Sequence, residues 1–246
     1  MKGNFRKFLW TAYDHLGGLI VVNLLWGILS IPWMVLAYIL VAVAQGLGER
    51  FGLIALILAV EGVLFSPPTI LLFCAARIWA QKREIDWKDL LAEGRRFATR
   101  AQAIGAALVL ATFIVLVNIH FYQGIGGWVG LLLGGTMIWF ALGLALVGVY
   151  VFPVLVAQDG SVWHTLRQSF LLVIDNIKLS FGLLLAALFM LGVGALSGVG
   201  LFCGAGATLA LLLSVYFWEL LPKYTGAAHP EEPHRSLREV LRPWEV

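Results

Sequence analysis

Long apolar runs separated by short polar segments make up most of this 246-residue chain. A run of roughly 20 apolar residues is enough for an α-helix to cross the hydrocarbon of a bilayer. The runs occupy residues 16–44, 51–80, 101–121, 128–157, 178–196 and a last segment that ends near residue 221. This pattern predicts an all-α, polytopic membrane protein with about six transmembrane helices.

Three polar segments, one before the first run and two between later runs, carry apolar residues at helical spacing, at residues 5–16, 87–101 and 162–177. Asp86 and Ser161 stand where helix N-caps are expected. The segments are predicted to be amphipathic helices at the cytoplasmic interface of the membrane. Each leads into an outgoing span, an outer turn and a returning span, so three helix-hairpin repeats are predicted.

Prolines predict where the spans bend or end. Pro32 lies inside the first apolar run, where it removes a backbone hydrogen bond and should kink the helix. Pro67 and Pro68 interrupt the second run. Pro153 and Pro222 are predicted to end the fourth and the sixth runs, because proline does not continue a helix easily.

Composition and charge support the membrane class and suggest an orientation. Hydrophobic residues make up 61% of the chain and charged residues only 13%, about half of what soluble domains carry. In the six-run arrangement Arg50 alone of the 17 basic residues lies outside, which leaves 16 inside. Short basic loops stay in the cytoplasm, so a multi-pass protein of a bacterial inner (plasma) membrane with both termini cytoplasmic is predicted. No nucleic-acid partner is predicted.

The chain is expected to divide into two regions. Residues 1–222 form the six-span integral membrane domain, and residues 223–246 form a cytoplasmic tail. The tail combines a proline-containing linker with a short amphipathic helix, for which Ser236 and Glu239 supply a capping box. Besides the lipid bilayer, a membrane or cytoplasmic protein is the predicted partner, bound through this tail.

Glu61 is the one carboxylate well inside a predicted span. Burial of its charge would cost several kcal/mol unless the group is protonated, paired or hydrated. One interpretation is a proton or cation relay, or a contact to a substrate. The other is a structural glutamate, protonated or hydrogen-bonded, that faces Asn23 or a serine across a helix interface.

The other candidate positions are polar residues and hinges within the apolar runs. Asn23, with Trp26, is expected to bond across helices and set the packing of the first span. Glu219 is expected to pair with Lys223, four residues further on. No catalytic residue, cofactor site or metal-ligand set stands out, so no enzyme activity is predicted. The candidate functional or structural positions are Asn23, Trp26, Pro32, Glu61, Pro67, Pro68 and Pro153.

Short motifs in the apolar runs give the chain a resemblance to a known family. They are Asn23-Leu24-Leu25-Trp26 with Pro32, the proline-ended second run before a basic linker, and Tyr150-Val151-Phe152-Pro153 before a polar helix with Asn176. Over most of residues 1–222 the chain resembles the YesL-like bacterial membrane proteins, the domain of unknown function 624. The resemblance implies an inner-membrane protein often encoded beside genes for carbohydrate uptake and degradation, and it carries no catalytic residues.

Two functions are therefore weighed from the sequence. The first is an accessory or scaffold protein of the inner membrane that is linked to carbohydrate uptake. The second is a small solute transporter, or permease-like protein, that uses Glu61 at mid-membrane. A polar cavity joining Glu61, Asn23 and the proline breaks would favour transport, whereas an apolar interior would favour the accessory role.

Overall fold

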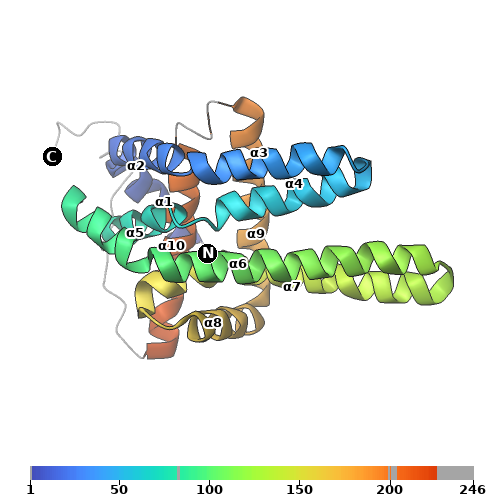
Figure 1. Ribbon diagram of the computed structural model, residues 1–246. Helices are drawn as coiled ribbons and strands as arrows, with labels where there is room; N and C mark the ends of the chain where they lie inside the picture. The colour runs from blue at the N-terminus through green and yellow to red at the C-terminus, as the bar shows by residue number, and fades with distance from the viewer. Residues whose placement is uncertain (1, 82–83, 199, 201–203, 226–246) are drawn as a thin grey trace.

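The computed structural model describes residues 2–81, 84–198, 200 and 204–225, and within these ranges the chain forms ten helices and no strand (Figure 1). The predicted all-α class is confirmed. The predicted tail helix lies outside the described residues. The helices are α1 (Lys2–Asp14), α2 (Leu16–Leu29), α3 (Ile31–Gln45), α4 (Glu49–Leu64), α5 (Thr69–Ala80), α6 (Trp87–Ile125), α7 (Gly127–Gln158), α8 (Val162–Asp175), α9 (Ile177–Ser197) and α10 (Gly206–Thr225).

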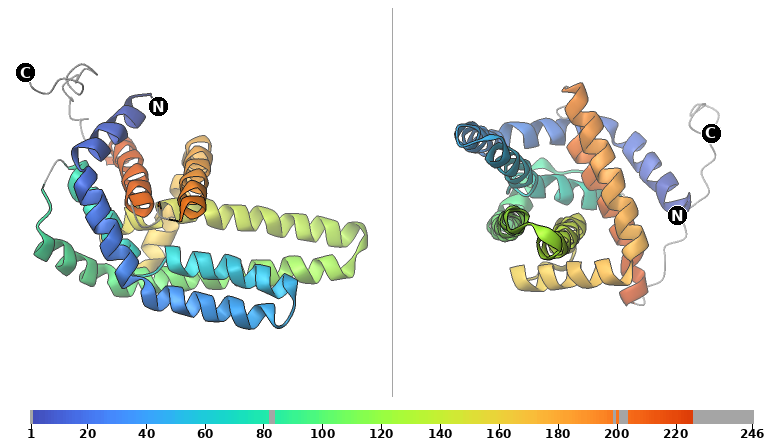
Figure 2. Two further views of the ribbon diagram at one scale, coloured as in Figure 1. Left: turned by 90° about the horizontal axis from the view of Figure 1, so that it is seen from above. Right: turned by 90° about the vertical axis from the view of Figure 1, so that its right-hand side faces the viewer.

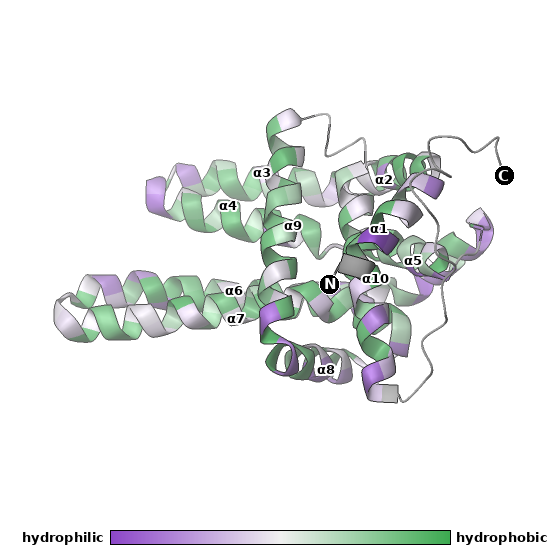
Figure 3. Ribbon diagram, turned by 180° about the vertical axis from the view of Figure 1, so that it is seen from behind, coloured by the Kyte–Doolittle hydropathy of each residue, from purple (hydrophilic) through white to green (hydrophobic). Residues whose placement is uncertain are grey.

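The helices form a body from which two hairpins project (Figures 1 and 2). One hairpin is α3 with α4, and the other is the outer part of α6 with α7. They lie side by side, and the body contains α1, α2, α5, α8 and α10. Figure 3 shows that hydrophobic residues dominate the length of both hairpins, while hydrophilic residues gather at the α3–α4 tip and on the body.

Three helices are long and apolar enough to cross a membrane, namely α6, α7 and α9. The number rises to five if each of two bent pairs is one span: α1 with α2, bent by 82°, and α4 with α5, bent by 45°. The membrane class is therefore supported, but six spans and three repeats are not confirmed. The right-hand view of Figure 2 looks along the two hairpins, and α9 and α10 run across that direction instead of forming a third parallel hairpin.

The predicted breaks at Pro32 and at Pro67–Pro68 are present. Helix α2 ends at Leu29, and Pro32 occupies the first turn of α3, where a missing backbone N–H costs little. Helix α4 ends at Leu64 and α5 begins at Thr69, on the far side of the two prolines.

The predicted helix ends at Pro153 and Pro222 are wrong, because both residues lie inside helices. Helix α7 continues past Pro153 to Gln158. A proline removes one donor and crowds one carbonyl, which bends a helix but ends it only if nothing holds the next turn. Here Val154, Leu155 and Val156 are buried, and their packing keeps the last turn of α7 helical.

Helix α5 is the centre of the body, and nine of its twelve residues are buried. It packs against α10, α6, α7 and α2. The approach of α6 is close, because a Cβ at Gly94 would overlap Leu71 and a Cβ at Gly105 would overlap the carbonyl oxygen of Phe65. Glycine at these two positions lets α6 lie directly on the bent α4–α5 pair.

The amphipathic segments form helices as predicted, with the predicted N-caps. Asp86 Oδ1 accepts a hydrogen bond from the Lys88 N–H at 2.8 Å, and Ser161 Oγ accepts from the His164 N–H at 3.3 Å. Helix α6 has no break near residue 101, so the second segment and the third apolar run are one helix of 39 residues.

An interfacial helix should turn its apolar face toward lipid. The apolar faces of these segments do not all do so. Leu90, Phe97 and Ala101 of α6 are buried in the body. By contrast, α1 and α8 leave large apolar side chains exposed, namely Phe5, Leu9, Tyr13, Trp163, Phe170 and Ile174. The periodicity identifies an apolar face but cannot tell whether protein or lipid covers it.

Candidate functional site

The structure brings several candidate residues together in one buried cluster, which we call the polar junction: Asn23 and Trp26 of α2, and Ser66 and Thr69 beside the α4–α5 break. All four are buried. Asn23 and Trp26 are three residues apart and therefore lie on one face of α2. The Trp26 indole N–H donates to Thr69 Oγ1 at 3.0 Å, which connects α2 to the start of α5.

Asn23 connects α2 to the start of α10. Its Oδ1 accepts a hydrogen bond from the backbone N–H of Ala207 at 3.0 Å. The first N–H groups of a helix have no partner within it, so Asn23 caps α10 from another helix. A Cβ at Gly206 would lie 2.9 Å from Asn23 Oδ1 and 3.2 Å from Leu72 Cδ1, and this close approach favours glycine there.

Ser66 and Thr69 compensate for the helix break at the two prolines. In a continuous helix the carbonyl of Val63 would accept from the N–H of residue 67, but Pro67 has none. Instead, the Ser66 N–H donates to the Val63 oxygen at 3.2 Å, Ser66 Oγ at 2.6 Å and Thr69 Oγ1 at 3.3 Å. The bend therefore leaves this half-buried carbonyl satisfied.

Glu61 lies outside the polar junction, on the interface between α4 and α6. Its Oε1 accepts a hydrogen bond from Thr112 Oγ1 at 3.0 Å. Its Oε2 is buried and has no hydrogen-bond partner among the described residues. The expected partner, Asn23 or a serine, is wrong, since the partner is Thr112. The contacts of Glu61 and of the polar junction share no residue.

The remaining hinge positions are apart from both places. Pro32 comes two residues after Ser30, whose buried Oγ lacks a hydrogen-bond partner within the described ranges. Pro153 is buried in α7 beside Phe152, and the Phe152 ring contacts Phe65 and Phe73. These contacts are apolar, so they support packing and show no binding chemistry.

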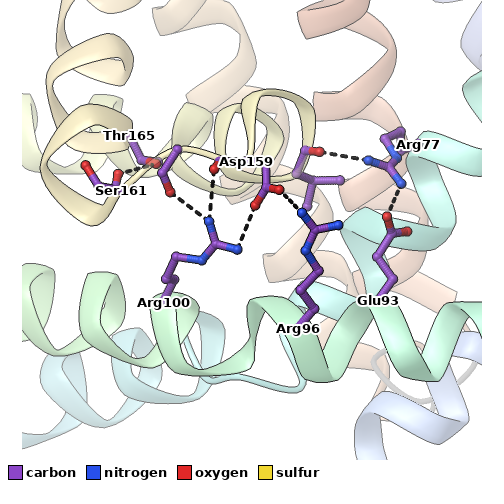
Figure 4. A network of polar contacts seen from close by, with 9 residues as sticks. Arg77, Glu93, Arg96, Arg100, Asp159, Ser161 and Thr165 are labelled. Carbon is purple, nitrogen blue, oxygen red and sulfur yellow. Dashed lines mark hydrogen bonds and ion pairs between the residues drawn. The ribbon is translucent and has the colours of Figure 1, made fainter.

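A second polar network, the arginine cluster, joins α5 and α6 to the end of α7 (Figure 4). It consists of Arg77, Glu93, Arg96, Arg100 and Asp159. Arg77 forms an ion pair with Glu93 and donates to the Val156 oxygen at 2.9 Å. Arg96 and Arg100 both pair with Asp159.

The arginine cluster satisfies the carbonyl groups at the C-terminus of α7. Arg100 donates to the oxygens of Asp159 and Gly160, each at 3.0 Å. Asp159 ends the helix in a left-handed conformation with φ of 52°. Cations are favourable at a helix C-terminus, where the carbonyl dipoles leave partial negative charge. The sequence alone counts these arginines only among the basic residues that favour the cytoplasmic side.

The predicted ion pair between Glu219 and Lys223 is wrong. Glu219 pairs instead with Lys7 of α1, at 3.1 Å between Nζ and Oε1. Lys223 donates to Asn176 Oδ1 at 3.4 Å, and Tyr224 donates to Asp175 at 2.9 Å. The end of α10 is thus connected to α1 and to the α8–α9 boundary.

Sequence reasoning missed Ser66, Thr69 and Thr112, the residues that complete both buried polar sites. A hydroxyl residue on each side of Pro67–Pro68 was a usable signal for the first two, because a proline break leaves carbonyls in need of donors. Thr112 gave no such signal, since nothing in the sequence pairs it with Glu61. Within the described part of the chain, no group of three or more His, Cys, Asp or Glu residues could hold a metal ion.

Comparisons of the chain with protein-family models, with curated protein sequences and with solved structures found no match. The fold and its contacts define an all-helical protein of the membrane type. The likeness to the YesL-like proteins stays a prediction from sequence.

Proposed function

We propose that this chain is an inner-membrane protein that serves as an accessory or scaffold component and not as an enzyme. Its link to a carbohydrate-uptake system rests on the resemblance to the YesL-like proteins alone. The observation that supports the scaffold role is the use of polar groups in the body. The polar junction and the arginine cluster both join helices to one another, as a rigid platform requires.

The proposal includes six crossings with both termini in the cytoplasm, as the charge distribution favours. The outer turns would be the α3–α4 tip, the α6–α7 tip and the end of α9. The crossing direction of α9 is the part of this topology most in need of a test, because α9 does not run parallel to the hairpins.

Cysteine labelling tests the topology. In a chain whose two cysteines are replaced by alanine, single cysteines at Leu47, Gln123 and Leu196 should react with an impermeant maleimide added outside intact cells. Cysteines at Lys88 and Arg167 should react only after the cells are opened. If the cysteine at Leu196 alone is not labelled, α9 lies in the plane of the membrane. Labelling of the cysteine at Lys88 in intact cells would show that the orientation is the opposite of the proposed one.

The scaffold role predicts a partner for the C-terminal tail. Deletion of residues 230–246 should leave the rest of the chain inserted and stable but reduce recovery of a membrane or cytoplasmic partner in a detergent pull-down. Equal recovery with and without the tail would argue against this part of the proposal. Loss of the folded protein would show that the tail packs into the core.

One observation favours the second candidate, a small solute transporter. Glu61 places a buried carboxyl oxygen without a hydrogen-bond partner among the described residues on an apolar helix. Proteoliposomes containing a pH-sensitive dye would test it: proton uptake that depends on the protein and is abolished by Glu61→Gln would favour transport. No uptake with either protein would favour the scaffold.

A further inference from the structure

The Glu61–Thr112 pair carries an inference that deepens the second candidate function and rests on the proposed crossing of the bilayer by α4 and α6. We propose that the Glu61 carboxyl group, held by Thr112 between the two hairpins, is a site that binds and releases a proton at mid-membrane.

The positions of Glu61 and Thr112 along their helices support a place for the pair at mid-depth in the bilayer. Glu61 is twelve residues from Glu49 at the hairpin tip, about 18 Å along a helix. Thr112 is twelve residues from Arg100 and thirteen from the end of α6 at Ile125, about 18 and 20 Å. Thr112 thus lies near the middle of the apolar part of α6, and Glu61 of α4, which accepts its hydrogen bond, lies at the same depth.

Among the described residues of α4 and of the helices packed against it, no other charge lies close enough to compensate Glu61. Helix α4 packs against α3 and α6. The titratable side chains on these three helices outside their charged ends are Tyr38, His120 and Tyr122, and Tyr122 is ten residues from Thr112, about 15 Å along α6. The His120 ring contacts Phe51, which is ten residues from Glu61 and so about 15 Å away along α4. The nearest cations on these helices are Arg50 and Arg100. Arg50 is eleven residues from Glu61 on α4, and Arg100 is twelve residues from Thr112 on α6, where the helix enters the body.

The oxygen atoms available at Glu61 are enough to bind a proton but too few to bind a metal cation. An ionised carboxylate offers about four lone-pair positions, and the structure fills one, through Thr112. Ca²⁺ needs six or more oxygen ligands and Mg²⁺ six, whereas two residues supply oxygen here. A proton needs one oxygen atom, and Glu61 Oε2 is buried and without a protein partner in the described ranges.

The pair can be reached from the lipid side. Glu61 is half-buried, and a Cβ at the next residue, Gly62, would have no atom within 4 Å, so the side chain lies at the edge of the helix interface beside an open part of α4. An apolar reagent dissolved in the bilayer could therefore approach the carboxyl group, while a charged reagent in water could not.

Dicyclohexylcarbodiimide, which dissolves in the bilayer, is a suitable probe because it reacts with the acid form of a carboxyl group. The Glu61 proton moves to one carbodiimide nitrogen, and a Glu61 oxygen bonds to the central carbon. The acyl group then migrates to nitrogen and forms a stable N-acylurea. The whole reagent adds, and no atom leaves and no electron is transferred.

The experiment treats full-length protein in native membranes and locates the adduct by peptide mass spectrometry. We expect modification at Glu61 that decreases as the pH is raised, and none at that position in Glu61→Gln. Gly62→Ala, which adds a methyl group in open space, is the matched control and should be modified like the parent. Thr112→Val should keep the modification and extend it to higher pH, because the lost donor stabilised the ionised form more than the acid.

Two results would overturn the proposal. The first is absence of the adduct at Glu61 across the pH range. The second is equal reaction of Glu61 and the exposed tip residue Glu49 with a water-soluble carbodiimide, which would place Glu61 in water. A failure of the bilayer placement would be seen separately, as wrong labelling at Leu47 and Gln123, so the two causes can be distinguished.

Discussion

The polar junction and the Glu61–Thr112 pair are both polar sites buried in an apolar helical protein, yet they differ in how completely they are hydrogen-bonded. At the junction, Asn23 accepts from a helix N-terminus, Trp26 donates to Thr69, and two hydroxyl groups join the Ser66 N–H as donors to the Val63 carbonyl, which Pro67 cannot bond. At Glu61, one oxygen has a donor and the other has none in the described part of the chain.

This difference separates a structural polar site from a candidate functional one. A buried polar group that is fully hydrogen-bonded holds its helices in one arrangement, and loss of one partner leaves the other unsatisfied. A partly satisfied group keeps the capacity to bind something else. We therefore expect substitutions at the junction to lower stability, and neutral substitutions at Glu61 to leave stability nearly unchanged.

The largest expected effect is that of Glu61→Lys. A permanent cation at the centre of a spanning helix costs about 3 kcal/mol on insertion scales, and Thr112 cannot compensate it. The fraction of the protein recovered in membranes should fall strongly, whereas Glu61→Gln should be recovered like the parent. Quantitative immunoblotting of membrane and soluble fractions measures both. Equal loss in Glu61→Gln would show that Glu61 is a structural residue like those of the polar junction.

Asn23→Leu should have the next largest effect. It leaves the Ala207 N–H buried without its acceptor and crowds Gly206, so we expect a loss of about 2–3 kcal/mol in the free energy of unfolding. Asn118→Leu is the matched control, since the Asn118 amide donates only to Ile114 of its own helix among the contacts described. Unfolding by SDS in mixed micelles, followed by tryptophan fluorescence, compares the two variants. Similar stabilities would show that the α2–α10 contact adds little.

Thr69→Val tests the other half of the polar junction. The substitution keeps the shape but removes the acceptor for Trp26 and a donor to Val63, so a destabilisation of about 1–2 kcal/mol is expected. Thr136→Val is the control, because the Thr136 hydroxyl donates to Leu132 within α7. Thermal unfolding in detergent gives both values. A larger loss for Thr136→Val would contradict the assignment of the junction as the more important polar site.

Arg96→Ala should give the smallest effect and tests whether burial, and not partnering alone, decides the energy. Arg96 pairs with Asp159, but its side chain is 62% exposed. Exposed ion pairs contribute about 0.2–1 kcal/mol, and salt screens them. The difference from the parent in thermal unfolding should shrink further at high salt. A loss as large as that of Asn23→Leu would mean that the arginine cluster holds the body more strongly than the junction does.

The sequence predicted individual helices better than their arrangement. The breaks near Pro32 and Pro67 and the N-caps at Asp86 and Ser161 are local properties, and all four are present. Pro153 was misjudged because burial of the next residues decides whether a helix continues, and burial depends on distant segments. The same holds for the direction of α9, which hydrophobicity does not specify.

The candidate polar residues were found, but their partners were not. Asn23 and Glu61 stand out in apolar runs because a polar group there needs a partner. Which group supplies it depends on how helices far apart in the chain meet. Glu219 shows this clearly: the nearest cation in sequence is Lys223, but the ion pair is with Lys7.

The contact between Asn23 and Ala207 joins residues 184 positions apart. Ribosomes add about 5–20 residues per second, so Asn23 waits on the order of ten to forty seconds before its partner is made. The contact from Trp26 to Thr69 spans only 43 positions and can form much earlier. Assembly in the membrane would then begin with α2 and α5 and finish when α10 arrives, which makes the synthesis of α10 the step that closes the body.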